Sequence, residues 1–166
     1  MTVYHGTTLE IQKPAIIKNE IGRDFGFAFY TTDIKEQAER WAVRRAKLLS
    51  RIMGKRQMPI VNIYNWNHGQ DTKFKQFNGV SMEWLDMVVE CRSNPEYVHG
   101  YDIVEGKIAN DNVGETVSFV VQGIMRKEDA IERLKFENIN NQIAFCSEIS
   151  LKELEFVKSY SIEEDN

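Results

Sequence analysis

The stretches Tyr4–Thr8 (YHGTT) and Phe25–Thr32 (FGFAFYTT) decide how this chain folds. Each combines aromatic residues, which favour a β-strand, with hydroxyl residues at its end. The first stretch predicts a strand over Thr2–His5 that Gly6 ends, and the second predicts a strand over Phe27–Thr31. Two short strands near the start of the chain are therefore the first elements that the sequence predicts.

The second stretch also predicts which side chains face a pocket. Successive side chains of a strand point to opposite faces of the sheet. Phe27 and Phe29 therefore share one face, and Ala28 and Tyr30 share the other. We expect the two phenylalanines to fill the core and Tyr30 to face a pocket.

The size of the chain is that of one domain with one core, at 166 residues and 19.3 kDa. We expect a single domain over residues 1–162 and an acidic tail over residues 163–166. Because no apolar run reaches the roughly 20 residues of a membrane helix and no secretory signal opens the chain, we expect a cytoplasmic protein without membrane contacts. Cys91 and Cys146 lie in apolar surroundings, which predicts reduced, buried thiols, with a disulfide as the alternative.

The rest of the pattern places helices between strands and indicates an α+β fold. The strongest helical pattern begins at Asp33, which forms a predicted capping box with Glu36, and ends at Gly54. The segment 116–121 fits a strand or a helix. The expected apolar face of the first helix consists of Ala38, Trp41, Ala42, Leu48, Leu49, Ile52 and Met53. The other predicted helices are 81–92 and 127–137, the other strands are 59–66, 101–104, 107–109, 142–146 and 154–162, and loops are expected over 65–81 and 92–100.

A third stretch, Asn141–Cys146 (NQIAFC), opens a predicted strand with a polar residue. Together, the His-Gly of the first stretch, the Phe-Tyr of the second and the glutamine of the third resemble the nicotinamide-binding motifs of the ADP-ribosyltransferase superfamily. They follow the His-Tyr-Glu pattern, with Gln142 in place of the usual glutamate. The first two stretches are also similar to rifampicin ADP-ribosyltransferases.

Further blocks of the chain resemble an uncharacterised bacterial family of small, toxin-like transferase domains, from about residue 2 to residue 156. These blocks are Asp24–Gly26, Tyr101–Val104, Ala109–Asp111 and Asn141–Gln142. The resemblance implies an ADP-ribosyltransferase-like fold, in which two split antiparallel β-sheets with flanking helices enclose a nicotinamide cleft. Members often lie beside small antitoxin-like genes, which implies a toxin or defence role and a cognate antitoxin as partner.

The resemblance assigns roles in binding NAD, the co-substrate. His5 contacts the adenosine ribose, Gly6 anchors the carboxamide, Tyr30 stacks on nicotinamide, and Gln142 orients the reacting ribose. We count His5, Tyr30 and Gln142 as catalytic candidates. The expected NAD contacts also include Thr7, Phe29 and Arg44. The structural alternatives are a buried histidine, a core tyrosine and a glutamine at a strand edge.

Gln142 is neutral and so supplies no countercharge to the positive charge that develops on the ribose when nicotinamide leaves. A glutamine in place of a glutamate would lower the stabilisation of the transition state by a few kcal/mol, on the order of one preorganised electrostatic contact. The acids that could compensate are Asp111, Asp24 and Glu148. We expect Asp111 to do so, because it directly follows the predicted strands that end near residue 109.

The segment 40–56 carries seven arginine and lysine side chains and no acid, although the whole chain has a net charge of −4. The simplest interpretation is a solvated helix face. The alternative is a phosphate-binding surface for the NAD pyrophosphate or for a nucleic acid. The histidines and cysteines lack metal-ligand spacing, and the chain has no phosphate-binding glycine loop.

These observations favour an NAD-dependent ADP-ribosyltransferase that modifies a protein or a nucleic acid. Two alternatives stay open: an NAD-hydrolysing toxin, in which water is the acceptor, and a catalytically silent module that binds a nucleotide or a partner. The acceptor leaves no motif in the sequence.

Overall fold

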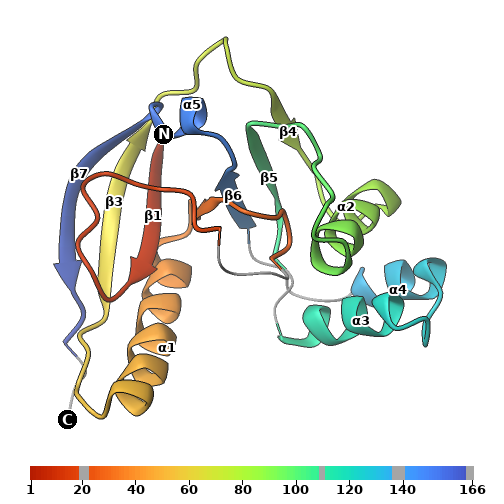
Figure 1. The fold of residues 1–166 in the computed structure, drawn as a ribbon, viewed down its shortest axis with the longest axis horizontal. Helices are drawn as coiled ribbons and strands as arrows, with labels where there is room; N and C mark the ends of the chain where they lie inside the picture. Colours follow the sequence, from red (N-terminus) through yellow and green to blue (C-terminus); the bar gives the residue numbers. More distant parts are fainter. Residues whose placement is uncertain (19–22, 109–110, 136–140, 164–166) are drawn as a thin grey trace.

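The computed structural model describes residues 1–18, 23–108, 111–135 and 141–163, and they form a mixed α+β fold with two sheets (Figure 1). The strands are β1 (Thr2–Thr7), β2 (Phe29–Thr31), β3 (Ile60–Trp66), β4 (Phe74–Gln76), β5 (Ile103–Lys107), β6 (Asn141–Phe145) and β7 (Leu154–Ser161). The helices are α1 (Lys35–Met53), α2 (Met82–Ser93), α3 (Asp111–Val121), α4 (Lys127–Leu134) and α5 (Glu148–Leu151). The α+β class expected from the sequence is confirmed, and most of the predicted acidic tail lies outside the described residues.

The two sheets differ in the direction of their strands. The first has the order β1-β3-β7 and is antiparallel throughout. The second has the order β2-β6-β5-β4, in which β4 runs parallel to β5. The prediction that both sheets are antiparallel is therefore wrong for the edge strand β4. The strand β4 lies in a segment that the sequence predicted to be a loop.

A pair of backbone hydrogen bonds joins the sheets where the first two sequence stretches meet. Tyr4 N donates to Thr32 O over 2.8 Å, and Thr32 N donates to Tyr4 O over 2.9 Å. Because Tyr4 precedes His5 and Thr32 closely follows Tyr30, this bridge brings the two candidate side chains into one neighbourhood.

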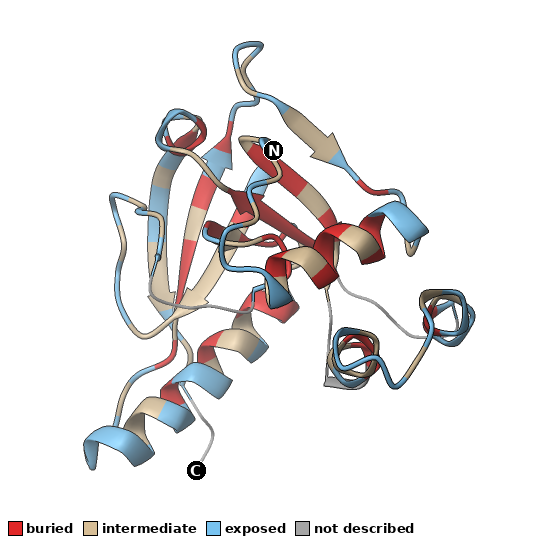
Figure 2. Ribbon diagram, turned by 45° about the vertical axis from the view of Figure 1, so that its right-hand side comes forward, coloured by how far each residue is buried: buried red, intermediate tan, exposed pale blue. Residues whose placement is uncertain are grey.

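Three apolar cores hold the elements together. Figure 2 colours the buried positions of the chain red. Residues of both sheets, such as Phe29, Tyr64 and Phe145, form the core between the sheets. The other face of the second sheet packs against α2, α3 and α4 through residues that include Trp84 and Leu134. The third core is small and lies between α1 and the first sheet.

The helix α1 packs on β1 without any side chain between them at Gly6. A Cβ atom on Gly6 would lie 2.0 Å from the carbonyl oxygen of Ala38 and 2.8 Å from the nitrogen of Ala42. Only glycine permits this approach. The prediction that Gly6 ends this strand is wrong, because β1 continues through Gly6 to Thr7.

The ends and faces of α1 agree only partly with the sequence pattern. It ends at Gly54, which has a left-handed φ of 62°, as predicted. Its N-cap is Ile34, without a side-chain cap, so the Asp33 capping box is wrong. Of the predicted apolar face, Ala38 and Ala42 are buried, whereas Leu48, Ile52 and Met53 are exposed. Figure 1 shows the reason, since α1 extends beyond the end of β1.

Smaller corrections concern single elements. Phe27 precedes β2 and is 39% exposed, so only Phe29 of the phenylalanine pair lies in the core. The strand β5 runs unbroken through Gly106, where two strands were predicted. The ambiguous segment 116–121 belongs to the helix α3. Ser81 caps α2 as expected, accepting a hydrogen bond from Trp84 N.

Candidate active site

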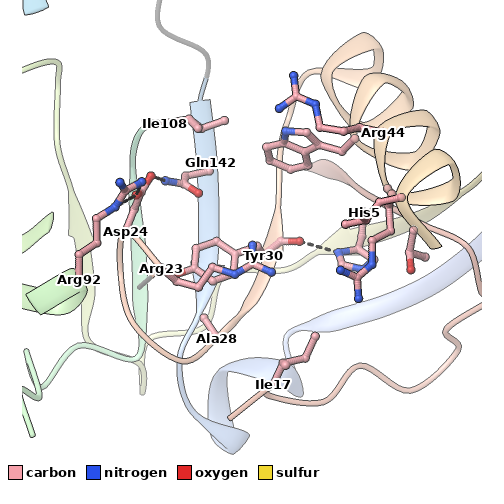
Figure 3. Close-up of a pocket in the computed structure, with 15 residues that line it drawn as sticks. His5, Ile17, Arg23, Asp24, Ala28, Tyr30, Arg44, Arg92, Ile108 and Gln142 are labelled. Atoms are coloured by element: carbon pink, nitrogen blue, oxygen red, sulfur yellow. Dashed lines mark hydrogen bonds and ion pairs between the residues drawn. The ribbon is translucent and has the colours of Figure 1, made fainter. Parts of the chain in front are cut away.

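A cleft of about 410 Å³ lies between β1, α1 and the second sheet (Figure 3). His5, Gly6 and Thr7 reach it from β1, Tyr30 from β2 and Gln142 from β6. The helix α1 contributes Trp41, Arg44, Arg45 and Leu48, and the remaining lining residues are Ile17, Arg23, Asp24, Ala28, Arg92 and Ile108. The three sequence stretches thus meet in one cavity, as the sequence predicted.

His5 is held in one orientation by contacts on two sides. Its Nδ1 lies 2.7 Å from the carbonyl oxygen of Tyr30, and its ring stacks on Phe29 with centroids 4.4 Å apart. Since a carbonyl oxygen only accepts hydrogen bonds, Nδ1 carries the proton and Nε2 is an acceptor. The pKa of His5 is lowered to about 4, because burial outweighs the hydrogen bond to Tyr30, which raises the pKa, and because the positive charges of Arg23 and Arg45 also lower it. His5 is therefore neutral at pH 7.

Tyr30 presents its ring to the cleft while its hydroxyl group is engaged elsewhere. The hydroxyl donates to Gly26 O over 2.7 Å and accepts from Phe25 N over 3.1 Å. Burial and the nearby charge of Asp24 raise the pKa of Tyr30 well above its usual value. The guanidinium of Arg23 lies over the ring, 5.4 Å from its centroid. Tyr30 therefore offers an aromatic face to a flat, positively charged group, not an acid or a base.

Gln142 is buried and its amide has a fixed direction. Its Nε2 donates to Asp24 Oδ2 over 2.9 Å and lies 3.5 Å from Lys107 O. In Figure 3 the nitrogen faces Asp24 and the carbonyl oxygen lies on the other side of the amide. The direction of the nitrogen therefore leaves the carbonyl oxygen as the acceptor that Gln142 offers within the cleft.

Asp24 is the acid that stands beside Gln142. It is buried, lines the cleft, and accepts a hydrogen bond from Arg92 Nε over 2.8 Å as well as the one from Gln142. The sequence favoured Asp111, whose side chain lies outside the described residues, although its backbone begins α3. Glu148 begins α5 and is not among the residues that line the cleft.

The other predicted NAD contacts divide into two groups. Thr7 and Arg44 line the cleft. Phe29 is 1% exposed and lies behind His5 in the core between the sheets, so it positions the imidazole and does not face the cavity. No local motif pointed to Arg92 and Arg23, because their roles depend on tertiary contacts with Asp24 and Tyr30.

Other kinds of chemistry find no support in the described residues. Within that part of the chain, no group of three or more histidine, cysteine or acidic residues is placed to hold a metal ion. Cys91 and Cys146 are unpaired, and burial raises the pKa of each thiol to about 12, which disfavours the reactive thiolate. The helices that the structure describes include none with the length and apolar character to cross a membrane.

Comparisons with known proteins place the chain in a family but give no function. No curated protein and no solved structure matches it. One family profile matches residues 1–156, which is nearly the whole chain. The chain therefore belongs to DUF3990, a family described as a protein of unknown function.

Proposed function

We propose that this protein is an NAD-dependent ADP-ribosyltransferase that modifies a macromolecule. The observation that supports the proposal is the convergence of His5, Tyr30 and Gln142, from three remote strands, on one cleft. These are the residues whose pattern resembles the superfamily's three motifs. As part of the same proposal, the protein is a bacterial toxin or defence component of the cytoplasm, held in check by a cognate antitoxin.

The chemistry of the cleft fits the parts of NAD. The face of Tyr30, now covered by the flat cation of Arg23, suits a nicotinamide ring, which is also flat and positively charged. The neutral His5 offers Nε2 as an acceptor for a ribose hydroxyl. Arg44 and Arg45, which line the cleft, could bind the pyrophosphate, because one guanidinium group can donate hydrogen bonds to two phosphate oxygens at once.

Gln142 and Asp24 would act together on the reacting ribose. The bond to nicotinamide breaks with its electron pair going to the ring, so positive charge develops on the sugar. The carbonyl oxygen of Gln142 would accept a hydrogen bond from a ribose hydroxyl, and Asp24 would hold the amide in that direction through Nε2. The carboxylate of Asp24 also places a negative charge behind the amide, although Arg92 offsets part of it.

The test is the release of nicotinamide from NAD by the purified protein, with and without a cell lysate as a source of acceptors. We expect release that depends on His5, Tyr30 and Gln142, and transfer of labelled ADP-ribose to a macromolecule. Cleavage of NAD without labelling would identify an NAD hydrolase instead. NAD binding without any turnover would identify the silent module.

A further inference from the structure

One segment of the chain carries a dense group of positive charges. Residues 40–56 contain seven arginine and lysine side chains, and no acid occurs anywhere from residue 40 to residue 70. The chain as a whole nevertheless has a net charge of −4. An anionic macromolecule is therefore attracted to this segment and repelled by the rest of the surface.

The helix α1 arranges these charges along one exposed face. Arg40, Arg44, Lys47 and Arg51 follow one another at intervals of three or four residues, which places them on the same side of a helix, and all four are exposed. The rise of about 1.5 Å per residue separates Arg44 from Arg51 by about 10 Å along the axis. We call these four residues the basic face.

The basic face leads from the cleft to a second hollow. This hollow has a volume of about 300 Å³ and is lined by Ala46, Lys47, Ser50, Arg51, Arg56, Gln57 and Pro59. The described residues that line it include three cations and no acid.

A turn and a side-chain hydrogen bond shape this hollow. Gly54 turns the backbone with its left-handed φ of 62°, and Gln57 N donates to Ser50 Oγ over 2.8 Å. Arg51 and Arg56, which stand on either side of this turn in the sequence, both line the hollow.

The two cavities share one helix. Trp41, Arg44 and Leu48 line the cleft, and Lys47 and Arg51 line the hollow. A strand bound along the basic face would extend from one cavity to the other, with apolar surface at Trp41 and Leu48 for a base and cations for its phosphates.

We propose that the acceptor is a single-stranded nucleic acid that binds along the basic face, with a base at the cleft and phosphates at Lys47, Arg51 and Arg56. A nitrogen or oxygen atom of the base would bond to the ribose carbon as the bond to nicotinamide breaks; nicotinamide would leave with that bond's electron pair, and the proton of the attacking atom would pass to water. The role as acceptor rests on the proposed transferase activity, whereas the binding does not. Arginine predominates over lysine among the seven cations, and paired guanidinium donors match phosphate oxygens. An acidic protein partner would need no aromatic surface beside the charges, so the nucleic acid fits the two features together.

The experiment is fluorescence anisotropy with a labelled single-stranded oligonucleotide of mixed sequence, about 12 nucleotides long, in DNA and RNA form. About four phosphate contacts predict a salt slope near −3 and a loss of affinity of about 50-fold between about 50 and 200 mM salt. The double variant Arg51→Glu/Arg56→Glu should weaken binding at least about tenfold and reduce the slope by about 1.4, the contribution of two contacts. Lys152→Glu/Lys158→Glu, with the same charge change at exposed positions outside this segment, should bind as the unmodified protein does.

Three results would overturn the inference: no oligonucleotide binding, binding that the Arg51/Arg56 variant leaves unchanged, or a polyglutamate peptide that competes at equal charge concentration. The outcome is separable from that of the proposed function. Arg51 and Arg56 do not line the cleft, so the double variant should release nicotinamide from NAD at the unmodified rate when no oligonucleotide is present. An unmodified protein that cleaves NAD but does not bind the oligonucleotide would overturn this inference alone. An unmodified protein that binds the oligonucleotide but does not cleave NAD would overturn the proposed function alone.

Discussion

Gln142 donates a hydrogen bond over 2.9 Å to the buried carboxylate of Asp24. The residue at the third motif is neutral, but an acid stands directly behind it and is itself paired with Arg92. Under the proposed function, Asp24 would supply the negative charge that a glutamate supplies in the enzymes that this chain resembles, one residue further from the ribose.

Replacing Asp24 by asparagine should lower the rate of NAD cleavage about 100-fold, because one preorganised electrostatic contact is typically worth this much. The variant should still fold, with a loss of about 1–3 kcal/mol in the free energy of unfolding, since Arg92 loses its charged partner. Nicotinamide release and urea unfolding measure the two effects. Glu148→Gln, the same kind of change outside the cleft, is the control. Equal activity of the Asp24 variant and the control would contradict the role of Asp24.

Replacing Gln142 by glutamate should not raise activity, although it restores the residue of the resembling enzymes. It removes the donor to Asp24 and places two carboxylates within hydrogen-bond distance, where both cannot be ionised without a large cost. A protonated carboxyl can still donate to Asp24, so the variant should be least destabilised near pH 5 and lose stability as the pH rises. Thermal melting at about pH 5 and about pH 8 checks this sign.

The matched control for that variant is the exchange Asp24→Asn/Gln142→Glu. It restores one amide and one carboxylate, so it should recover much of the stability at high pH. A single Gln142→Glu variant that is as stable as the unmodified protein at both pH values would show that the two side chains do not interact.

His5 should make stability depend on pH in a defined window. Its pKa is about 4 in the folded protein, against about 6.5 when unfolded. The unfolded chain therefore binds more protons between these values, and stability should fall as the pH drops from about 6.5 to about 4. His5→Asn keeps a donor for Tyr30 O without a titrating group, so it should lose about 1–3 kcal/mol less over this range. Urea unfolding at about pH 6.5 and about pH 4 measures this change in the free energy of unfolding. If the change between these pH values is the same for the unmodified protein and for His5→Asn, the role of His5 is refuted.

Gly6→Ala should destabilise the fold by at least about 1–3 kcal/mol, because a methyl group has no space against the backbone of α1. Gly114→Ala is the matched control, since the nearest atom to its Cβ would be Arg92 Nη1 at 3.8 Å. In the helix α3 this change should leave stability unchanged or raise it by up to about 1 kcal/mol. Similar melting temperatures for the two variants would show that α1 can move away from β1.

Local signals in the sequence predicted much of the fold. Gly54 and Ser81 act through their own backbone and side chain, and both positions were predicted correctly. The strand β4 was missed because its three residues gain order only by pairing with β5. The Asp33 cap failed because its carboxylate accepts instead from Asn141, a residue more than a hundred positions away.

The candidate site shows the same division between local and remote causes. His5, Tyr30 and Gln142 were found from short motifs, each on its own strand. The preference for Asp111 over Asp24 followed proximity along the chain to the predicted strands. The position of Asp24 depends on Arg92, which lies 68 residues later near the end of the helix α2. Residue spacing in the sequence does not predict a contact of this kind.

As proposed, the cleft holds NAD and breaks its bond to nicotinamide. The most direct measurement is nicotinamide release by the purified protein beside its His5→Ala and Tyr30→Ala variants, with folding checked by thermal melting. We expect the unmodified protein to release nicotinamide and both variants to lose this activity while remaining folded. An unmodified protein that releases no nicotinamide with any acceptor, and whose melting temperature NAD leaves unchanged, would contradict it.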